Sequence, residues 1–152
     1  MSDIATVSLP GLDGRLGADQ QTALKDLIQS ASFKPDNDNN GPYDLTLSSE
    51  EGRLIVKIRN TQGNELPALI LSLSPYRRII HDYFLMIEGY EESRRTATSC
   101  RLEAIDMGRR GLHNEGAEMM IDRLRGKIEM DFETARRLFT LICALQKPSV
   151  RS

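Results

Sequence analysis

The chain has no tryptophan, only two cysteines and two histidines, and no long apolar run. No segment approaches the roughly 20 apolar residues that a membrane-spanning helix needs, and the N-terminus lacks the basic and apolar regions of a secretory signal. We therefore expect a soluble, cytoplasmic protein with no membrane partner. Cys100 and Cys143 form no CxxC pair, and in a reducing compartment we expect both to be buried, unreactive thiols.

Metal chemistry is not expected either. His81 and His113 are the only histidines, and neither HxxxH nor HExxH spacing occurs around them. We accordingly predict no metal site and no cofactor.

Strong charge of one sign is also missing. The net charge is −2, with −4 on residues 1–75 and +2 on residues 76–152. Near-neutrality argues against a protein that wraps nucleic acid, and four Phe, four Tyr and no Trp leave few rings for base stacking. Nucleic acid is thus a less favoured partner than a small anion or an acidic protein.

The most regular feature of the sequence is the periodic spacing of its apolar residues. Residues 4–9 alternate weakly and predict a short edge strand, whereas residues 18–32 carry the apolar stripe of an amphipathic helix. Residues 34–42, KPDNDNNGP, contain turn formers and acids, and we expect a solvated loop in which nothing is buried.

Three strands should follow, over residues 43–48, 53–59 and 66–73. The short links that contain glycine predict an antiparallel meander. The third strand is apolar on both faces, so we expect it to be the best covered, with Pro67 near its start.

Helical periodicity begins at Ser74, which we expect to be an N-cap, and runs to about Glu92. Further helices are predicted from about Thr98 and from Asp131 as N-cap, and the last is apolar on nearly every side. The chain is thus expected to be a single α+β domain over residues 1–152, with any flexibility at 1–17 and 147–152. It should contain a three- to four-stranded antiparallel sheet, an N-terminal helix and three or four C-terminal helices on one face.

Residues 105–117, IDMGRRGLHNEGA, depart from this regular pattern. Three glycines in a helix cost roughly 3 kcal/mol relative to alanine. Either the helix breaks into a loop, or it continues and the glycines allow another backbone to approach closely. If it is helical, Asp106, Arg110, His113 and Asn114 share one face.

Three interpretations of this segment remain open. Its polar side chains could form ordinary helix ion pairs and caps. Alternatively, Arg109, Arg110, His113 and Asn114 could bind an anion or nucleotide. Thirdly, His113 could act as a general base that is oriented by Asp106 or Glu115.

Arginine outnumbers lysine 15 to 5 and occurs in doublets at 77–78, 94–95, 109–110 and 136–137. Arginine is favoured where two parallel hydrogen bonds to a carboxylate or phosphate are needed. Ion pairs on the protein surface would also account for the excess of arginine over lysine. Arg77 and Arg78 fall in the first turn of a predicted helix, where the helix dipole disfavours cations. We therefore expect them to share an anion, either a carboxylate of the fold or a ligand.

The strings LSLSPYRRIIHDYF, EAIDMGRRGLHNEGAE and GKIEMDFETARRLFTLICAL, with NNGPYDLTLSSEEGRLIVKI, resemble uncharacterised protein family 0262, a group of small alphaproteobacterial proteins. The resemblance spans roughly residues 20–145. It implies no activity, cofactor or partner, and no site residue can be transferred from it.

The leading hypothesis is a non-catalytic cytoplasmic protein that binds an anionic partner, whether an acidic protein surface, a nucleotide-like ligand or RNA. Arg109, Arg110, His113 and Asn114 would bind it, with help from Arg77 and Arg78. One alternative is a small hydrolase that acts on a phosphoester or nucleotide through Asp106, His113 and Glu115. The other is a structural homodimer, because the apolar last helix must be covered by the core or by a partner.

Overall fold

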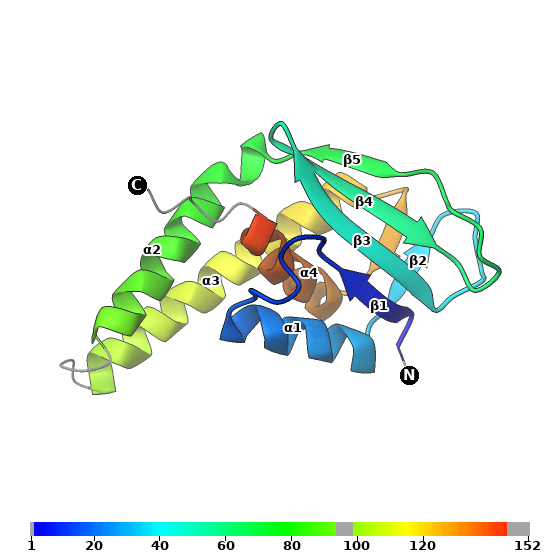
Figure 1. The fold of residues 1–152 in the computed structure, drawn as a ribbon. Coiled ribbons are helices and arrows are strands. Elements are labelled where there is room, and N and C mark those ends of the chain that lie inside the picture. Colours follow the sequence, from blue (N-terminus) through cyan, green and yellow to red (C-terminus); the bar gives the residue numbers. More distant parts are fainter. Residues whose placement is uncertain (1, 94–98, 146–152) are drawn as a thin grey trace.

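The computed structural model of the protein describes residues 2–93 and 99–145. Figure 1 shows a curved sheet with helices packed against one of its two faces. The α+β prediction is confirmed. In chain order the elements are β1 (Ile4–Ser8), α1 (Ala18–Gln29), β2 (Phe33–Pro35), β3 (Tyr43–Glu50), β4 (Arg53–Arg59), β5 (Leu69–Ser72), a 3₁₀ turn (Ser74–Tyr76), α2 (Arg77–Ser93), α3 (Ser99–Leu124), β6 (Ile128–Met130) and α4 (Phe132–Leu145).

The main sheet has the strand order β1-β3-β4-β5. Strands β3, β4 and β5 form the predicted antiparallel meander. The predicted edge strand β1 is present, but it pairs with β3 in parallel, so the expectation of a wholly antiparallel sheet is wrong. A parallel neighbour requires a crossover connection, which α1 and β2 supply.

A second, two-stranded sheet pairs β2 with β6 and was not predicted. Strand β2 begins at Phe33 and extends into the expected loop; it buries Phe33 and Pro35, while Lys34 faces solvent. Asp38 is also half-buried, and it accepts hydrogen bonds from Tyr43 Oη at 2.8 Å and Asn60 Nδ2 at 3.0 Å. The expectation that nothing in residues 34–42 is buried is therefore wrong, because its polar groups find partners elsewhere in the fold.

Strand β5 lies at the sheet edge rather than under the best cover. Among its residues only Leu71 is buried, and Ile70 is 57% exposed. Apolar side chains on both faces of this strand suggested burial, but in the part of the chain that the structure describes no helix covers the outer face of the sheet here (Figure 1). The strand begins at Leu69 and not at residue 66, so Pro67 lies just before its start and not within it.

The helices lie where the sequence predicts them, but one of the predicted N-cap residues is wrong. Ser74 lies within the 3₁₀ turn instead of capping a helix, and no side chain caps that turn. Asp131 is confirmed as the N-cap of α4, since Thr134 N donates to Asp131 Oδ1 at 2.9 Å. Among the described helices, none combines the length and apolarity needed to cross a bilayer.

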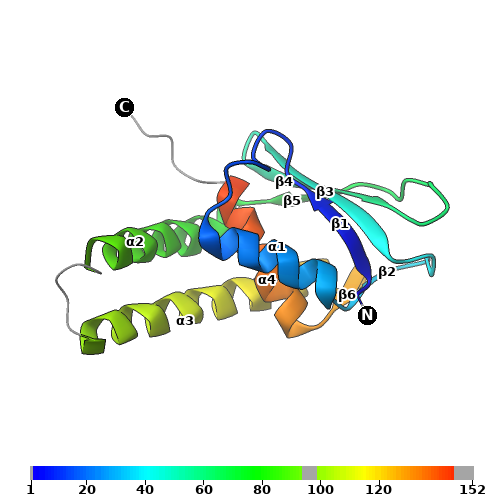
Figure 2. The same cartoon turned by 60° about the horizontal axis from the view of Figure 1, so that its bottom comes forward.

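Helix α4 occupies the centre of the core. It packs against α1 and α3 and also contacts β3, with α2 and α3 extending side by side away from the sheet (Figure 2). Its buried side chains include Leu138, Phe139 and Cys143. Burial raises the pKa of the Cys143 thiol well above its usual value, as expected of an inert thiol. The core of its own chain thus covers the apolar surface that suggested a partner.

Helix α3 runs unbroken through residues 105–117, so the helical alternative is confirmed and the loop alternative is wrong. Gly116 is buried, and a Cβ there would lie 2.6 Å from three ring atoms of Phe139. A Cβ at Gly108 would meet the terminal methyl of Met86 of α2, the flexible end of a side chain, whereas Gly111 is exposed, and a Cβ there would meet nothing within 4 Å. Two of the three glycines therefore permit close packing by helices of the same chain.

Alanine at these positions should have opposite effects. Gly116→Ala should destabilise the protein by about 1–3 kcal/mol, because the buried Phe139 ring has no room to move. Gly111→Ala should stabilise it by about 0.5–1 kcal/mol through helix propensity. Urea unfolding measures both changes, and equal midpoints for the two variants would contradict the packing role of Gly116.

Candidate functional site

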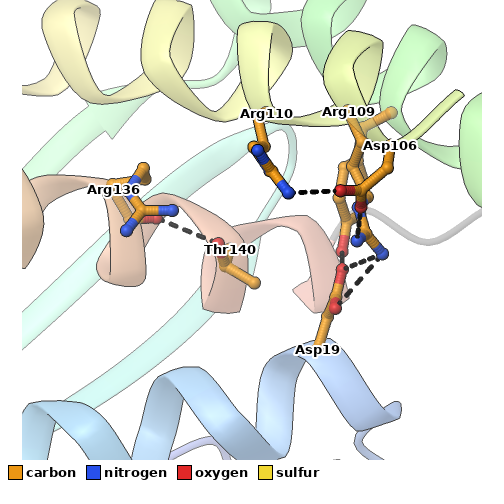
Figure 3. Close-up of polar contacts among 7 residues, drawn as sticks. Asp19, Asp106, Arg109, Arg110, Arg136 and Thr140 are labelled. Carbon is orange, nitrogen blue, oxygen red and sulfur yellow. Dashed lines mark hydrogen bonds and ion pairs between the residues drawn. The ribbon is translucent and has the colours of Figure 1, made fainter. Parts of the chain in front are cut away.

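A polar groove of about 230 Å³ lies between α1, α3 and α4. Figure 3 shows Arg110 of α3, Arg136 and Thr140 of α4 and Asp19 of α1 on these three helices, with Arg110 turned toward Asp106. We call it the arginine groove. Its lining residues are Asp19, Thr22, Ala23, Asp26, Arg109, Arg110, His113, Arg136, Arg137 and Thr140.

Two arginine doublets meet in this groove because α3 packs on α4. The sequence predicts the doublet at 109–110 as part of a binding site, whereas it marks the one at 136–137 only as a doublet. A signal for the second doublet is in the sequence nonetheless. Glu133, Arg136 and Arg137 are the charged positions of an otherwise largely apolar helix, and so they had to lie on its accessible side, whereas its two threonines are buried.

Arg109 is held between two carboxylates. It is 26% exposed, and its Nη1 lies 3.3 Å from Asp19 Oδ2 while its Nη2 bonds Asp106 Oδ1. Tyr83 Oη also donates to Asp19 Oδ2, at 3.1 Å. Arg109 and Asp19 therefore connect α1 to α2 and α3, which is a structural role at the end of the groove.

Arg110 and Arg136 are less constrained. Within the described residues each forms ion pairs through Nη2 alone, Arg110 with Asp106 Oδ2 at 2.6 Å and Arg136 with Glu133 Oε1. Arg110 is 68% exposed. Since a guanidinium carries five N–H donors, both side chains retain donors for a further acceptor.

Arg137 closes the groove toward the end of α1. Its Nη1 donates to the Ser30 carbonyl at 3.3 Å, and its Nε lies 3.8 Å from Asp26 Oδ2. It is only 25% exposed, so this side chain fixes α4 to α1.

His113 lies at the buried side of the groove. It is 7% exposed, and its ring centroid is 4.9 Å from that of Tyr83 and 6.4 Å from that of Phe139. The Nε2 atom is buried, and no described residue hydrogen-bonds it. Burial lowers the pKa of His113 to about 4, with Asp19 opposing this shift and Arg109 and Arg136 adding to it. The imidazole is therefore neutral at pH 7.

The other predicted residues lie elsewhere. Asn114 is exposed on α3, and Glu115 pairs with Arg78, which also lies 3.2 Å from Asp82. The expected anion beside Arg78 is thus a carboxylate of the fold. Arg77 is exposed and has no ion pair with a described residue. The doublet at 94–95 lies outside the described residues, as does the segment 147–152.

The proposed catalytic trio does not converge. Asp106 bonds Arg109 and Arg110, His113 is enclosed by aromatic rings, and Glu115 points to Arg78 of α2. Along a helix, positions 106 and 115 fall on opposite sides, which explains this separation. A shared general-base arrangement is therefore not formed.

The buried His113 should make stability fall with acid. Its pKa is near 6.5 when unfolded and about 4 when folded, so the unfolded state binds more protons between these values. A contribution of about 3 kcal/mol, complete above pH 6.5, should be lost as pH falls to 4. Urea unfolding of His113→Phe should show a weaker loss over this range, with His81→Phe, at an exposed position of α2, as control. Parallel pH curves for wild type and His113→Phe would refute the assignment.

Comparison with known proteins identifies the chain's relatives. The model of "Uncharacterised protein family (UPF0262)" matches residues 3–148. A UPF0262 protein of Rhizobium leguminosarum bv. trifolii is 52% identical over 127 residues, covering 84% of this chain and 81% of that one. One from Brucella anthropi is 52% identical over 128 residues, with 84% and 80% covered. No solved structure matches. The chain, as its resemblance indicated, belongs to the UPF0262 family.

Proposed function

We propose that this protein is a non-catalytic cytoplasmic protein that binds an anionic partner in the arginine groove. The observation that carries the proposal is the convergence of two arginine doublets, from α3 and α4, on one concave site. Arginine binds carboxylate and phosphate through its planar set of donors. The groove thereby replaces the single segment 109–114 as the proposed binding site.

The charges of the groove support reversible binding. Four arginines line it against two carboxylates, Asp19 and Asp26, while Asp106 and Glu133 pair with arginines from the rim. These ion pairs hold the guanidinium groups in place before a ligand arrives, which reduces the entropy lost on binding. A bound anion would use the remaining donors of Arg110 and Arg136.

The shape of the groove favours a small anion over the other partners. A concave site encloses a compact ligand, whereas a protein partner usually needs a broad surface. The lining contains no aromatic side chain other than His113 on which a nucleic-acid base could stack, and the His113 ring is buried. We therefore place a small anionic ligand ahead of an acidic protein surface and of RNA.

Neutralising two groove arginines should weaken binding of a simple anion. The variant Arg110→Gln/Arg136→Gln should bind inorganic phosphate at least about tenfold more weakly, because it loses two charge-assisted interactions. Isothermal titration calorimetry measures this change. Arg125→Gln is the matched control, since Arg125 forms an exposed pair with Asp122 at 2.9 Å outside the groove. Equal affinities in all three proteins would contradict the proposal.

A companion substitution should have the opposite sign. Asp106→Asn removes the carboxylate that competes for Arg109 and Arg110, so phosphate should bind several times more tightly. Asp122→Asn is its control. If Asp106→Asn weakens phosphate binding instead, the arginines act as structural ion pairs and not as anion ligands.

A further inference from the structure

The two edges of the main sheet differ in how they are protected. Strand β1 forms one edge, and its register with β3 is irregular between Ile4 and Thr6. Directly after this strand Leu9 N donates to Asp13 Oδ1 at 2.8 Å, which places a carboxylate beside the end of the edge. Irregular register and charged side chains both hinder pairing with another strand. The β1 edge is therefore protected.

Strand β5 forms the other edge and is open. In the described part of the chain no strand pairs with its far side, and in Figure 1 it runs along the border of the sheet. Its register with β4 is regular from Leu69 to Ser72. The sequence has no charged residue between Glu65 and Arg77, and the nearest prolines lie outside the strand. Charges, prolines and bulges are what normally block an edge, and β5 contains none of them.

The hydrogen-bonding groups of this edge follow from the ladder. Just past the strand Leu73 N donates to Gly52 O at 2.9 Å, toward β4. In an antiparallel pair, successive residues direct their backbone groups alternately toward and away from the partner strand. Leu71 therefore faces β4, whereas the N–H and C=O groups of Ile70 and Ser72 face outward. Both residues are exposed.

The side chains beside these free groups are apolar. Ile70 is 57% exposed and lies opposite Ile55 of β4 on the outer face of the sheet. Cross-strand apolar pairs stabilise a sheet when a further strand extends the same face. The edge thus offers both backbone partners and an apolar surface to one more strand.

A second copy of this chain suits the edge better than a loose peptide does. A peptide must be ordered when it binds, which costs conformational entropy, whereas β5 of another copy is already held in extended form by β4. Self-pairing brings no like charges together along the strand, because β5 is uncharged. The net charge of −2 also leaves little repulsion between whole molecules.

We propose that two copies of this protein pair their β5 strands in antiparallel fashion around a two-fold axis, which joins the two main sheets into one. With Leu71 of each copy at the axis, Ile70 lies opposite Ser72 of the second copy. The outward N–H and C=O groups of these residues then bond each other. The arginine groove lies between α1, α3 and α4, away from this edge, so the dimer is independent of the proposed anion binding.

Sedimentation velocity of the full chain tests this dimer. Short paired strands bury little area, so the dimer should have a Kd on the order of 10 µM. The mass should be the 17.1 kDa of one chain at about 1 µM and approach twice that value at about 200 µM. The mass of one chain at both concentrations would overturn the inference.

A proline at the edge tests where the two copies meet. Ile70→Pro removes an outward N–H group that β4 does not use, so the fold should tolerate it. Its dimer Kd should rise at least about tenfold, because each copy loses an intermolecular hydrogen bond. Ile70→Val keeps this amide and a β-branched side chain, and it should dimerise like wild type. A dimer that Ile70→Pro retains would place the interface elsewhere and overturn the inference.

Hydrogen exchange of the wild-type protein gives a second readout if Ile70→Pro unfolds. The amides of Ile70 and Ser72 should exchange more slowly at about 200 µM than at about 1 µM, since they are bonded only in the dimer. The amide of Thr6, on the opposite edge strand, should exchange at the same rate at both concentrations. Unchanged exchange at Ile70 and Ser72 would overturn the inference.

Discussion

The fold depends on the close contact between α3 and α4 at Gly116 and Phe139. Helix α4 is apolar on nearly every side and must be enclosed, which requires its neighbours to come near its axis. Glycine at 116 removes the side chain that would otherwise fill the position of the Phe139 ring. The helix-propensity cost of that glycine, about 1 kcal/mol, is offset by burial of a complete phenyl group. The groove follows from the same contact, because it brings the doublet of α3 beside that of α4.

Local signals predicted most of the fold. Apolar periodicity placed α1, α2 and α4, and the two glycine-containing links placed the meander β3-β4-β5. The parallel pairing of β1 escaped these signals, as did two further features. Strands β2 and β6 have three residues each, too few for a repeating pattern. Whether β5 lies at the sheet edge depends on which other elements cover it. This cannot be predicted from the residues of β5 alone.

The candidate site was predicted in part. Arg109, Arg110 and His113 do line a groove, but sequence spacing alone also grouped them with Asn114 and Glu115, which point elsewhere. Arg136 and Arg137 could be found only by joining the polar side of α4 to that of α3, a contact between distant parts of the chain. The glycines of α3 were a true signal of close approach. What approaches at positions 108 and 116 is a side chain of the neighbouring helix, and not a ligand.

The arginine groove contains guanidinium groups that hold helices together and others that keep hydrogen-bond donors for a ligand. Arg109 and Arg137 tie α1 to α3 and α4, whereas Arg110 and Arg136 keep unused donors. Arginine side-chain NMR during a phosphate titration tests this division most directly. The Nε–H signals of Arg110 and Arg136 should shift to saturation while that of the exposed Arg53 on β4 stays constant. Uniform small shifts across all arginines, or none, would contradict a specific anion site in the groove.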